Sequence, residues 1–236
     1  MKKLLDRIFI DGLGGMAQGL FATLIIGTII QQIGLFMGGG TGDLIYELGK
    51  IAAGLTGAGI GVGVARKLEA GHLVIVSAAV VGMIGAFAGK ILSGQVLVDG
   101  NLVLAGPGEP LGAFAAAYLA IEIGILISGK TKLDIILTPL VCIGTGSAVG
   151  LFVGPPISEF MLWLGSLINW GTEQQPFLMG IVVSVLMGMI LTLPISSAAL
   201  GVILNLSGLA AGAATIGCCC NTVSYTHLTL PTKRIV

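Results

Sequence analysis

The sequence predicts an all-α polytopic membrane protein with about seven membrane segments. Hydrophobic residues occupy 55% of the positions and charged residues only 9%, whereas soluble domains carry roughly 25% charged residues. Apolar runs such as residues 17–37 are long enough, at about 1.5 Å per helical residue, to cross about 30 Å of hydrocarbon. The net charge is zero, and no basic patch indicates nucleic acid as a partner.

Hydropathy places the expected membrane segments in chain order. They are residues 17–37, 44–65, 73–92, 111–128, 135–153, 177–195 and 198–217. Between the fifth and the sixth, residues 155–170 carry apolar side chains at helical spacing, with Trp163 and Trp170 one heptad apart. This pattern is typical of a helix that lies in the membrane interface or is half inserted.

The basic residues indicate one orientation of these segments. They occur before the first segment, after the second and after the fourth, as Lys2, Lys3, Arg7, Arg66, Lys67, Lys130 and Lys132. Because Lys and Arg collect on the cytoplasmic side, we expect a multi-pass protein of the bacterial inner membrane with a cytoplasmic N-terminus. The topology after residue 154 stays open.

Glycine and cysteine suggest packing rather than chemistry. The chain has 39 glycines, several at the G-x-x-x-G spacing that lets membrane helices approach closely, as at Gly57, Gly85 and Gly146. The consecutive residues Cys218, Cys219 and Cys220 cannot supply the spaced ligand pairs of a zinc site. We expect neither a metal nor a cofactor.

The stretch from residue 94 to residue 114 interrupts the apolar pattern. Asp99-Gly100 lies between short apolar runs, which is the sequence signature of a β-hairpin. Pro107 and Pro110 prevent a continuous helix, and Gly106 frees the backbone. A broken or re-entrant segment of this kind is how many transporters form a substrate site.

This broken segment also resembles a known loop. Gly106-Pro107-Gly108-Glu109-Pro110 is similar to the G-[IV]-T-E-P loop of the membrane permease subunits (enzyme IIC) of the sugar phosphotransferase system, although Pro107 and Gly108 replace the usual Ile-Thr. A wider resemblance, carried by "ILTPLVCIGTGSAVGLFVGPPI" and "LTLPISSAALGVILNLSGLAAGAATIGC", extends to Asn221. It points to a divergent enzyme IIC-like family, some of whose members are named perfringolysin O regulators.

The resemblance implies a sugar ligand and separate partner chains. In that family the glutamate hydrogen-bonds sugar hydroxyls, which implies that Gly108, Glu109 and Pro110 contribute to substrate binding. Outside the tail His72 is the only histidine, and no soluble domain surrounds a cysteine. We therefore expect no catalytic residue in this chain, and phosphoryl-carrier subunits that are separate cytoplasmic chains.

Five further residues are candidates for the substrate path. Glu122 lies inside an expected segment, where a carboxylate costs roughly 2.5–3.5 kcal/mol, and Tyr118 is one helical turn away. Thr138, Ser196 and Ser197 are beside prolines, where hydroxyls can line a path or satisfy freed carbonyls. Glu109 could also be a solvated loop acid, and Glu122 a buried neutral acid.

The C-terminal end has a different character. From about Val223 the chain becomes abruptly polar and resembles a translated sequencing adapter. We expect a permease-like domain at residues 1–221, incomplete at its C-terminus, and a non-native tail at residues 222–236.

Three functions fit these observations. The first is a carbohydrate permease subunit that binds sugar in a membrane cavity and moves it by alternating access. The alternatives are a membrane sensor that binds a small polar ligand without transporting it, and a proton-coupled secondary transporter. Membrane lipid is an expected partner, and homodimer formation is left open.

Overall fold

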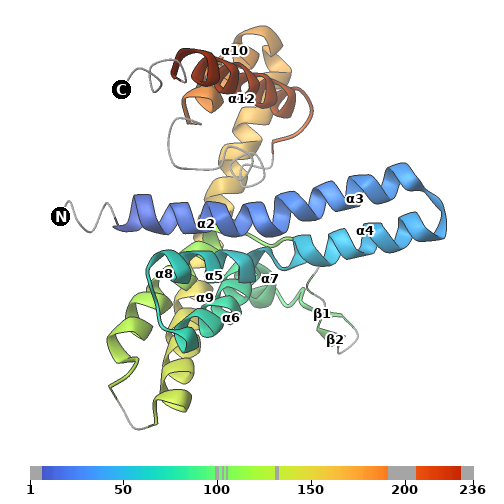
Figure 1. Cartoon of the computed structure of the whole chain (residues 1–236). Coiled ribbons are helices and arrows are strands. Elements are labelled where there is room, and N and C mark those ends of the chain that lie inside the picture. The colour runs from blue at the N-terminus through green and yellow to red at the C-terminus, as the bar shows by residue number, and fades with distance from the viewer. Residues whose placement is uncertain are drawn as a thin grey trace. The chain divides into compact units, whose positions relative to one another are not determined.

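Helices form most of the part of the chain that the structure describes (Figure 1). The computed structural model describes residues 7–98, 101–102, 104, 106–130, 133–190 and 206–229. The chain divides into two units, Met1–Glu159 and Phe160–Val236, and the long helix α9 (Asp134–Gln174) contributes residues to both. The predicted all-α class is confirmed in both units, apart from one short pair of strands.

The first unit holds most of the elements. In chain order they are the π-helix η1 (Arg7–Gly12), α2 (Leu13–Leu20), the π-helix η2 (Phe21–Ile25), α3 (Ile26–Met37), α4 (Gly39–Gly54), α5 (Thr56–Lys67), α6 (His72–Ala86), α7 (Ala88–Leu92), β1 (Leu97–Val98), β2 (Asn101–Leu102), α8 (Pro110–Ile127) and the first part of α9. The second unit holds the rest of α9, α10 (Pro176–Ile190) and α12 (Gly208–Thr229).

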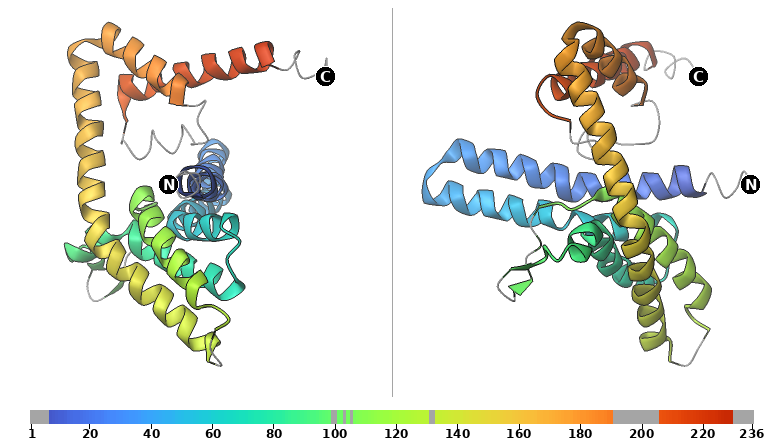
Figure 2. Two further views of the ribbon diagram at one scale, coloured as in Figure 1. Left: turned by 90° about the vertical axis from the view of Figure 1, so that its left-hand side faces the viewer. Right: turned by 180° about the vertical axis from the view of Figure 1, so that it is seen from behind.

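Helices α3 and α4 form a long antiparallel hairpin, called the arm below, which extends from the other helices of the first unit (Figure 2). The chain reverses at Gly38, whose φ of 60° suits glycine. Gly34 lets the two backbones touch, because a Cβ there would lie 2.6 Å from the Tyr46 nitrogen. Large apolar side chains such as Phe36 and Leu48 are exposed on the arm, as expected for contact with lipid.

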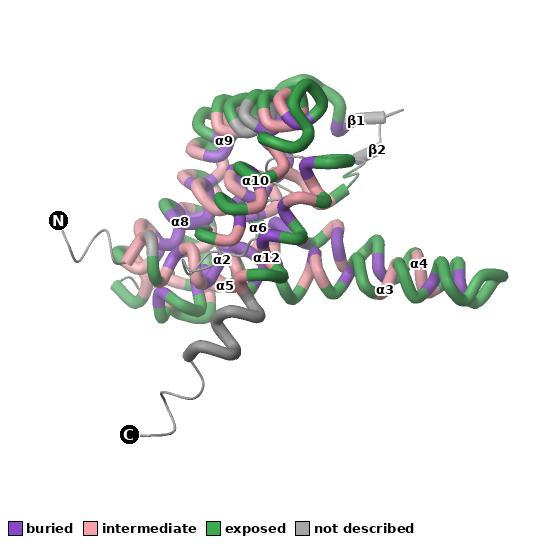
Figure 3. Tube along the Cα trace, turned by 90° about the horizontal axis from the view of Figure 1, so that it is seen from above, coloured by how far each residue is buried: buried purple, intermediate pink, exposed green. Residues whose placement is uncertain are grey.

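The remaining helices of the first unit pack tightly at glycines. A Cβ on Gly57 would lie 2.6 Å from the Gly82 oxygen between α5 and α6, and one on Gly85 would lie 2.6 Å from the Gly112 oxygen between α6 and α8. Gly146 brings α9 onto Val81 and Ala120. Buried residues gather on these helices, whereas the arm is largely exposed (Figure 3). The glycine-packing prediction is confirmed for Gly57, Gly85 and Gly146.

The structure does not support seven membrane segments. Within the described ranges, Ile10–Met37, Pro110–Ile127 and Asp134–Ile157 are long and apolar enough to cross a membrane. Helices α4 and α5 add a fourth candidate if they form one span, because they are bent by 49° at their junction. Helix α6 has 15 residues and is only about 22 Å long, because the expected segment 73–92 breaks at Phe87.

The last two expected segments are shortened as well. Pro176–Met189 and Gly208–Asn221 are apolar helices of 10–17 residues. Residues 191–205, which both segments need in order to reach their expected lengths, lie outside the described residues. The prediction of segments at 177–195 and 198–217 is therefore not supported.

The expected β-hairpin is reduced to a minimal strand pair. Leu97 pairs with Leu102 and Val98 with Asn101 in antiparallel register, and each strand has two residues. The turn residues Asp99 and Gly100 lie outside the described residues. A hairpin with two strands of ordinary length is not supported.

Helix α9 corrects the expectation of a separate interfacial helix at residues 155–170. It continues for 41 residues through Pro139, Pro155 and Pro156. Proline removes one backbone hydrogen bond and can bend a helix without ending it. At about 1.5 Å per residue the path along α9 is roughly 60 Å, twice the hydrocarbon thickness, and its candidate membrane span is Asp134–Ile157.

The second unit is built on the contact of α10 with α12. Val183, Met187 and Ala214 form its buried cluster. Gly217 lies directly on the Ser184 backbone, so the two helices approach closely. The Asn169 side chain of α9 accepts a hydrogen bond of 3.2 Å from the Ser207 nitrogen, which precedes α12.

Candidate functional site

The Gly106–Pro110 loop places Glu109 directly before helix α8. Gly106 and Gly108 have φ values of 84° and 71°, which only glycine adopts at little cost. Gly108 also lies against the end of α6, because a Cβ there would be 2.7 Å from the Ala86 Cβ. Pro110 is buried at the first position of α8, where its missing N–H costs nothing.

One backbone hydrogen bond fixes the loop to the break between α6 and α7. The Glu109 nitrogen donates to the Ala86 oxygen at 2.7 Å. Ala86 is the last residue of α6, and the next residue, Phe87, is almost fully buried between the two helices. The loop is thus held at two consecutive residues, Gly108 and Glu109, instead of moving freely in solvent.

The Glu109 carboxyl group is unusual in its surroundings. Its Oε1 atom is buried and has no hydrogen-bond partner among the described residues. Burial raises the pKa of this carboxyl group from 4.5 to about 7, while the Leu111 backbone N–H acts in the opposite direction. The side chain forms no N-cap hydrogen bond. It therefore offers a free acceptor that is partly withdrawn from water.

Three helices converge next to this loop through small residues. Gly112 of α8 lies near Gly85 of α6 and Gly154 of α9. Gly150, one turn earlier on α9, contacts Ala116 of α8 and Gly85. Such contacts bring the three helix backbones close together. Glu109 therefore lies directly beside a closely packed junction of α6, α8 and α9.

Glu122 lies toward the C-terminal end of α8, and Tyr118 lies near the middle of the helix. Glu122 accepts a hydrogen bond of 2.7 Å from the Arg7 Nε atom, an ion pair between residues that are 115 positions apart in sequence. The Tyr118 hydroxyl is buried beside this pair and interacts with both Glu122 and Arg7, but it forms no hydrogen bond of ordinary geometry among the described residues. The structure thus supplies Glu122 with a charged partner that the sequence analysis did not identify.

Glu109 and Glu122 do not form one site. They are 13 positions apart on one helix, which separates them by roughly 20 Å along its axis. Gly108, Glu109 and Pro110 lie at its N-terminal end, Tyr118 lies near its middle, and Glu122 lies toward its C-terminal end. A single ligand of hexose size cannot contact both carboxylates at this separation.

Thr138 has a local role in the structure. It is fully buried, and its hydroxyl donates to the Asp134 Oδ1 atom at 2.6 Å. The same oxygen accepts the Gly129 N–H at 3.0 Å, so the three residues fix the start of α9. Ser196 and Ser197, the other hydroxyl candidates, lie outside the described residues.

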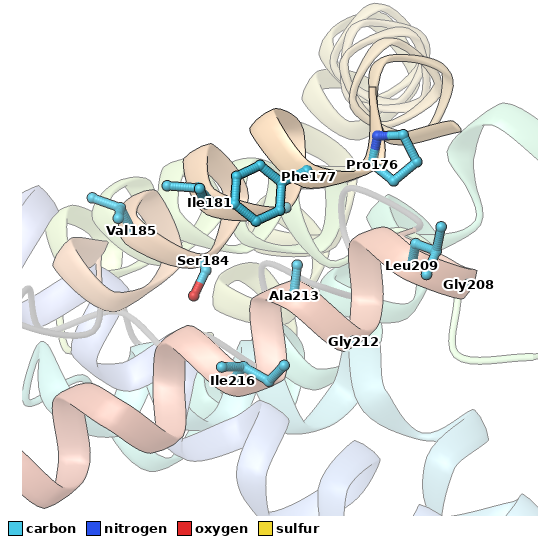
Figure 4. A pocket seen from close by; sticks show the side chains of 11 residues that line it. Pro176, Phe177, Ile181, Ser184, Val185, Gly208, Leu209, Gly212, Ala213 and Ile216 are labelled. Carbon is cyan, nitrogen blue, oxygen red and sulfur yellow. The ribbon is translucent and has the colours of Figure 1, made fainter. Parts of the chain in front are cut away.

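The second unit contains an open groove between α10 and α12, with a volume of about 550 Å³ (Figure 4). Phe177 and Ile181 line one side, Leu209 and Ala213 the other, and Ser184 supplies a hydroxyl. Its surface is mainly apolar, so it lacks the polar groups that would recognise a sugar. Within the described ranges, no three His, Cys, Asp or Glu side chains come together as a metal site.

Comparison with known protein families identifies the family of this chain. A family model described as "Phosphotransferase system, EIIC" matches residues 10–234, which include most of both units. This chain belongs to the phosphotransferase system EIIC family. The resemblance predicted from the Glu109 loop and the wider sequence is thereby confirmed. Neither the comparison with curated proteins nor that with solved structures found a match.

Family membership and apolar helices together identify an EIIC-family membrane protein. The matched region continues through residues 222–234, and the backbone of α12 continues to Thr229. The hypothesis of a non-native tail from residue 222 stays a prediction.

Proposed function

We propose that this chain is the sugar-translocating subunit of a phosphotransferase system and that Glu109 is its principal sugar-binding residue. The family supports a sugar permease subunit of this type in general. The observation that carries the assignment to Glu109 is its buried Oε1 atom, which has no partner among the described residues. Gly108 and the Ala86 hydrogen bond fix the backbone that carries this side chain.

Sugar hydroxyls match this environment. Each hydroxyl can donate to a carboxylate oxygen, and hydrogen bonds to a charged group contribute about 1.5–3 kcal/mol. A buried carboxylate oxygen that has already lost its water gains more binding free energy from such a donor than a fully hydrated carboxylate oxygen does. Ionised Glu109 is the competent form, because a protonated carboxyl group loses the charge-assisted bond.

Movement of the sugar follows from the packing around the loop. Glu109 is fixed to the end of α6, while Gly112 and Gly154 bring α8 and α9 to the same place. A shift of α6 and α7 relative to α8 would therefore expose Glu109 to one side of the membrane or the other. We infer alternating access around this junction, in a multi-pass protein with a cytoplasmic N-terminus.

The partners follow from the same proposal. EIIC-family membership implies cytoplasmic phosphotransferase subunits, and in our proposal they deliver the phosphoryl group, because this chain needs no phosphorylated residue of its own. Membrane lipid covers the exposed apolar side chains. Whether the chain forms a homodimer stays a prediction, which the mass of the purified detergent complex would test.

A binding experiment tests the assignment. Purified protein is titrated calorimetrically with D-glucose, D-mannose, D-fructose, N-acetyl-D-glucosamine, galactitol and cellobiose. We expect one of them to bind wild type and Glu109→Gln to weaken that binding by at least about tenfold. Glu173→Gln is the matched control, because Glu173 is an exposed carboxylate of the second unit. Equal affinity of wild type and Glu109→Gln would show that Glu109 is a solvated loop carboxylate that does not bind the sugar.

The sensor alternative makes the opposite prediction for transport. In proteoliposomes that also hold the cytoplasmic subunits, a permease accumulates phosphorylated sugar inside, whereas a sensor binds sugar without moving it. Binding without accumulation would therefore contradict the permease proposal even if Glu109→Gln loses affinity.

A further inference from the structure

A second polar cluster lies toward the C-terminal end of α8. It consists of Arg7 on η1 and of Tyr118 and Glu122 on α8, and the Phe114 ring lies 5.8 Å from the Tyr118 ring. Gly12 makes room for both rings, because a Cβ there would lie 3.2 Å from Phe114. The cluster is therefore built by packing of the N-terminal segment on α8.

The cluster has unused hydrogen-bonding capacity. Tyr118 is only 8% exposed, and its hydroxyl has no partner among the described residues. Arg7 donates to Glu122 through its Nε atom, and its terminal guanidinium nitrogens carry four further N–H donors. A buried hydroxyl without a well-formed hydrogen bond is destabilising, so a ligand that completes its hydrogen bonding would gain affinity.

The cluster is accessible from one end of the membrane segments. Arg7 precedes the candidate span Ile10–Met37, and Glu122 is five residues before the end of the span Pro110–Ile127. The side chains of Arg7 and Glu122 are 41% and 32% exposed. The ion pair is therefore not fully enclosed by protein.

The composition of the cluster favours a neutral polyhydroxylated ligand. An anion would be repelled by Glu122 and a cation by Arg7. A sugar offers both donors and acceptors, which fit the Glu122 carboxylate and the Arg7 guanidinium, and it has an apolar face suited to the Phe114 ring. The Tyr118 hydroxyl can both donate and accept, so it fits a third sugar hydroxyl.

We propose that Arg7, Tyr118 and Glu122 form a second sugar subsite farther along α8 than Glu109. This proposal rests on the proposed function. The sugar path then follows α8 from Glu109 past Tyr118 to Glu122, over roughly 20 Å. The Arg7–Glu122 contact holds the subsite closed, and Tyr118 gains its missing partner when sugar arrives.

The substitution Tyr118→Phe separates ligand binding from packing. It removes a hydroxyl that makes no hydrogen bond among the described residues, so the thermal midpoint should stay equal or rise. We expect the affinity for the sugar identified in the panel above to fall about three- to tenfold, the range of one neutral hydrogen bond. Tyr46→Phe, on the arm, is the matched control and should change neither quantity.

Arg7→Lys and Glu122→Gln extend the test. Lysine keeps the charge but loses the planar fork, so it should weaken sugar binding while Glu109 still contributes. Wild-type affinity in Tyr118→Phe and in Arg7→Lys would overturn the second subsite, and loss of binding in Glu109→Gln in the same series would leave the first proposal standing. Weaker sugar binding by Tyr118→Phe together with wild-type affinity in Glu109→Gln would support the second subsite and overturn Glu109 as the principal sugar-binding residue. If no sugar of the panel binds wild type, both proposals fail.

Discussion

At the residue scale, two glutamates on one helix have different environments. Glu109 has an orphaned buried oxygen, whereas Glu122 is paired with Arg7. The sequence could predict that both are special, because glycine and proline flank Glu109 and apolar residues surround Glu122. It could not assign Arg7 as the partner of Glu122, since a contact across 115 positions depends on helix packing. The basic residue before the first apolar run was the available signal.

The raised pKa of Glu109 predicts a pH dependence of stability. The folded state holds this proton up to about pH 7, whereas the unfolded state releases it near the ordinary carboxyl pKa of 4.5. Stability from this group is therefore fully present below pH 4.5 and is lost as the pH rises to about 7. Glu109→Gln should remove this component. The measurement is the thermal midpoint of both proteins between pH 4.5 and 8, followed by circular dichroism.

The comparison that decides is the difference between the two midpoints at each pH. We expect the thermal midpoint of Glu109→Gln to rise relative to that of wild type as the pH increases from 4.5 to about 7. A difference that stays constant with pH would mean that Glu109 is hydrated in the folded protein.

Gly108 should tolerate substitution less well than Gly106. Both have positive φ, so alanine at either position costs about 1–2 kcal/mol in backbone strain. Only Gly108 also meets a neighbour, the Ala86 Cβ at 2.7 Å, whereas Gly106 faces open space. We therefore expect Gly108→Ala to lower the thermal midpoint more than Gly106→Ala and to weaken sugar binding. Equal effects of the two substitutions would show that the loop does not pack against α6 at Gly108.

At the scale of the elements, hydropathy predicted apolar runs better than it predicted breaks. The runs at residues 17–37 and 44–65 become helices, but the second bends by 49° at Leu55 without a proline. The run at residues 73–92 breaks at Phe87, and α9 continues through three prolines. Bends of this kind depend on which neighbour each turn packs against, and average hydropathy does not contain that information.

The arm provides a prediction about helix packing. At Gly34 an added Cβ would lie 2.6 Å from the Tyr46 nitrogen and 2.7 Å from the Gly42 oxygen, both of them backbone atoms. Gly34→Ala must push α3 and α4 apart and should destabilise the protein by about 1–3 kcal/mol. Gly54→Ala, at the end of α4, meets nothing within 4 Å and should be neutral or stabilising by up to about 1 kcal/mol.

Detergent titration to the unfolding midpoint measures both arm variants. A Gly34→Ala protein as stable as Gly54→Ala would mean that the two arm helices are not in backbone contact in the membrane.

At the scale of the whole molecule, composition was sufficient to predict a membrane protein, and the Glu109 loop together with the wider sequence resemblance predicted its family. The family match from residue 10 to residue 234 covers most of both units. Among the candidate site residues, those of the Glu109 loop lie next to one another, whereas Thr138 serves the start of α9 and Tyr118 lies near the middle of α8. Sequence spacing along a helix does not reveal which end faces a ligand.

The final prediction concerns orientation. Gly71, in the turn before α6, lies next to Ser128 at the end of α8, since an added Cβ would be 3.4 Å from the Ser128 Oγ atom. Arg7 reaches Glu122 near the same end of α8. The basic residues around positions 7, 66 and 130 therefore gather at one end of the first unit, as the positive-inside rule requires of a cytoplasmic face.

Single-cysteine labelling in cells tests this orientation after the four native cysteines are replaced. We expect Ala70→Cys and Lys130→Cys to react with a membrane-impermeant maleimide only after the cytoplasmic side is opened. Asp99→Cys should react in intact cells, because its segment leads to the opposite end of α8. All three proteins must label fully in detergent, which controls for buried thiols. Reaction of positions 70 and 130 in intact cells would reverse the orientation, and reaction of only one of them would contradict the close approach of Gly71 to Ser128.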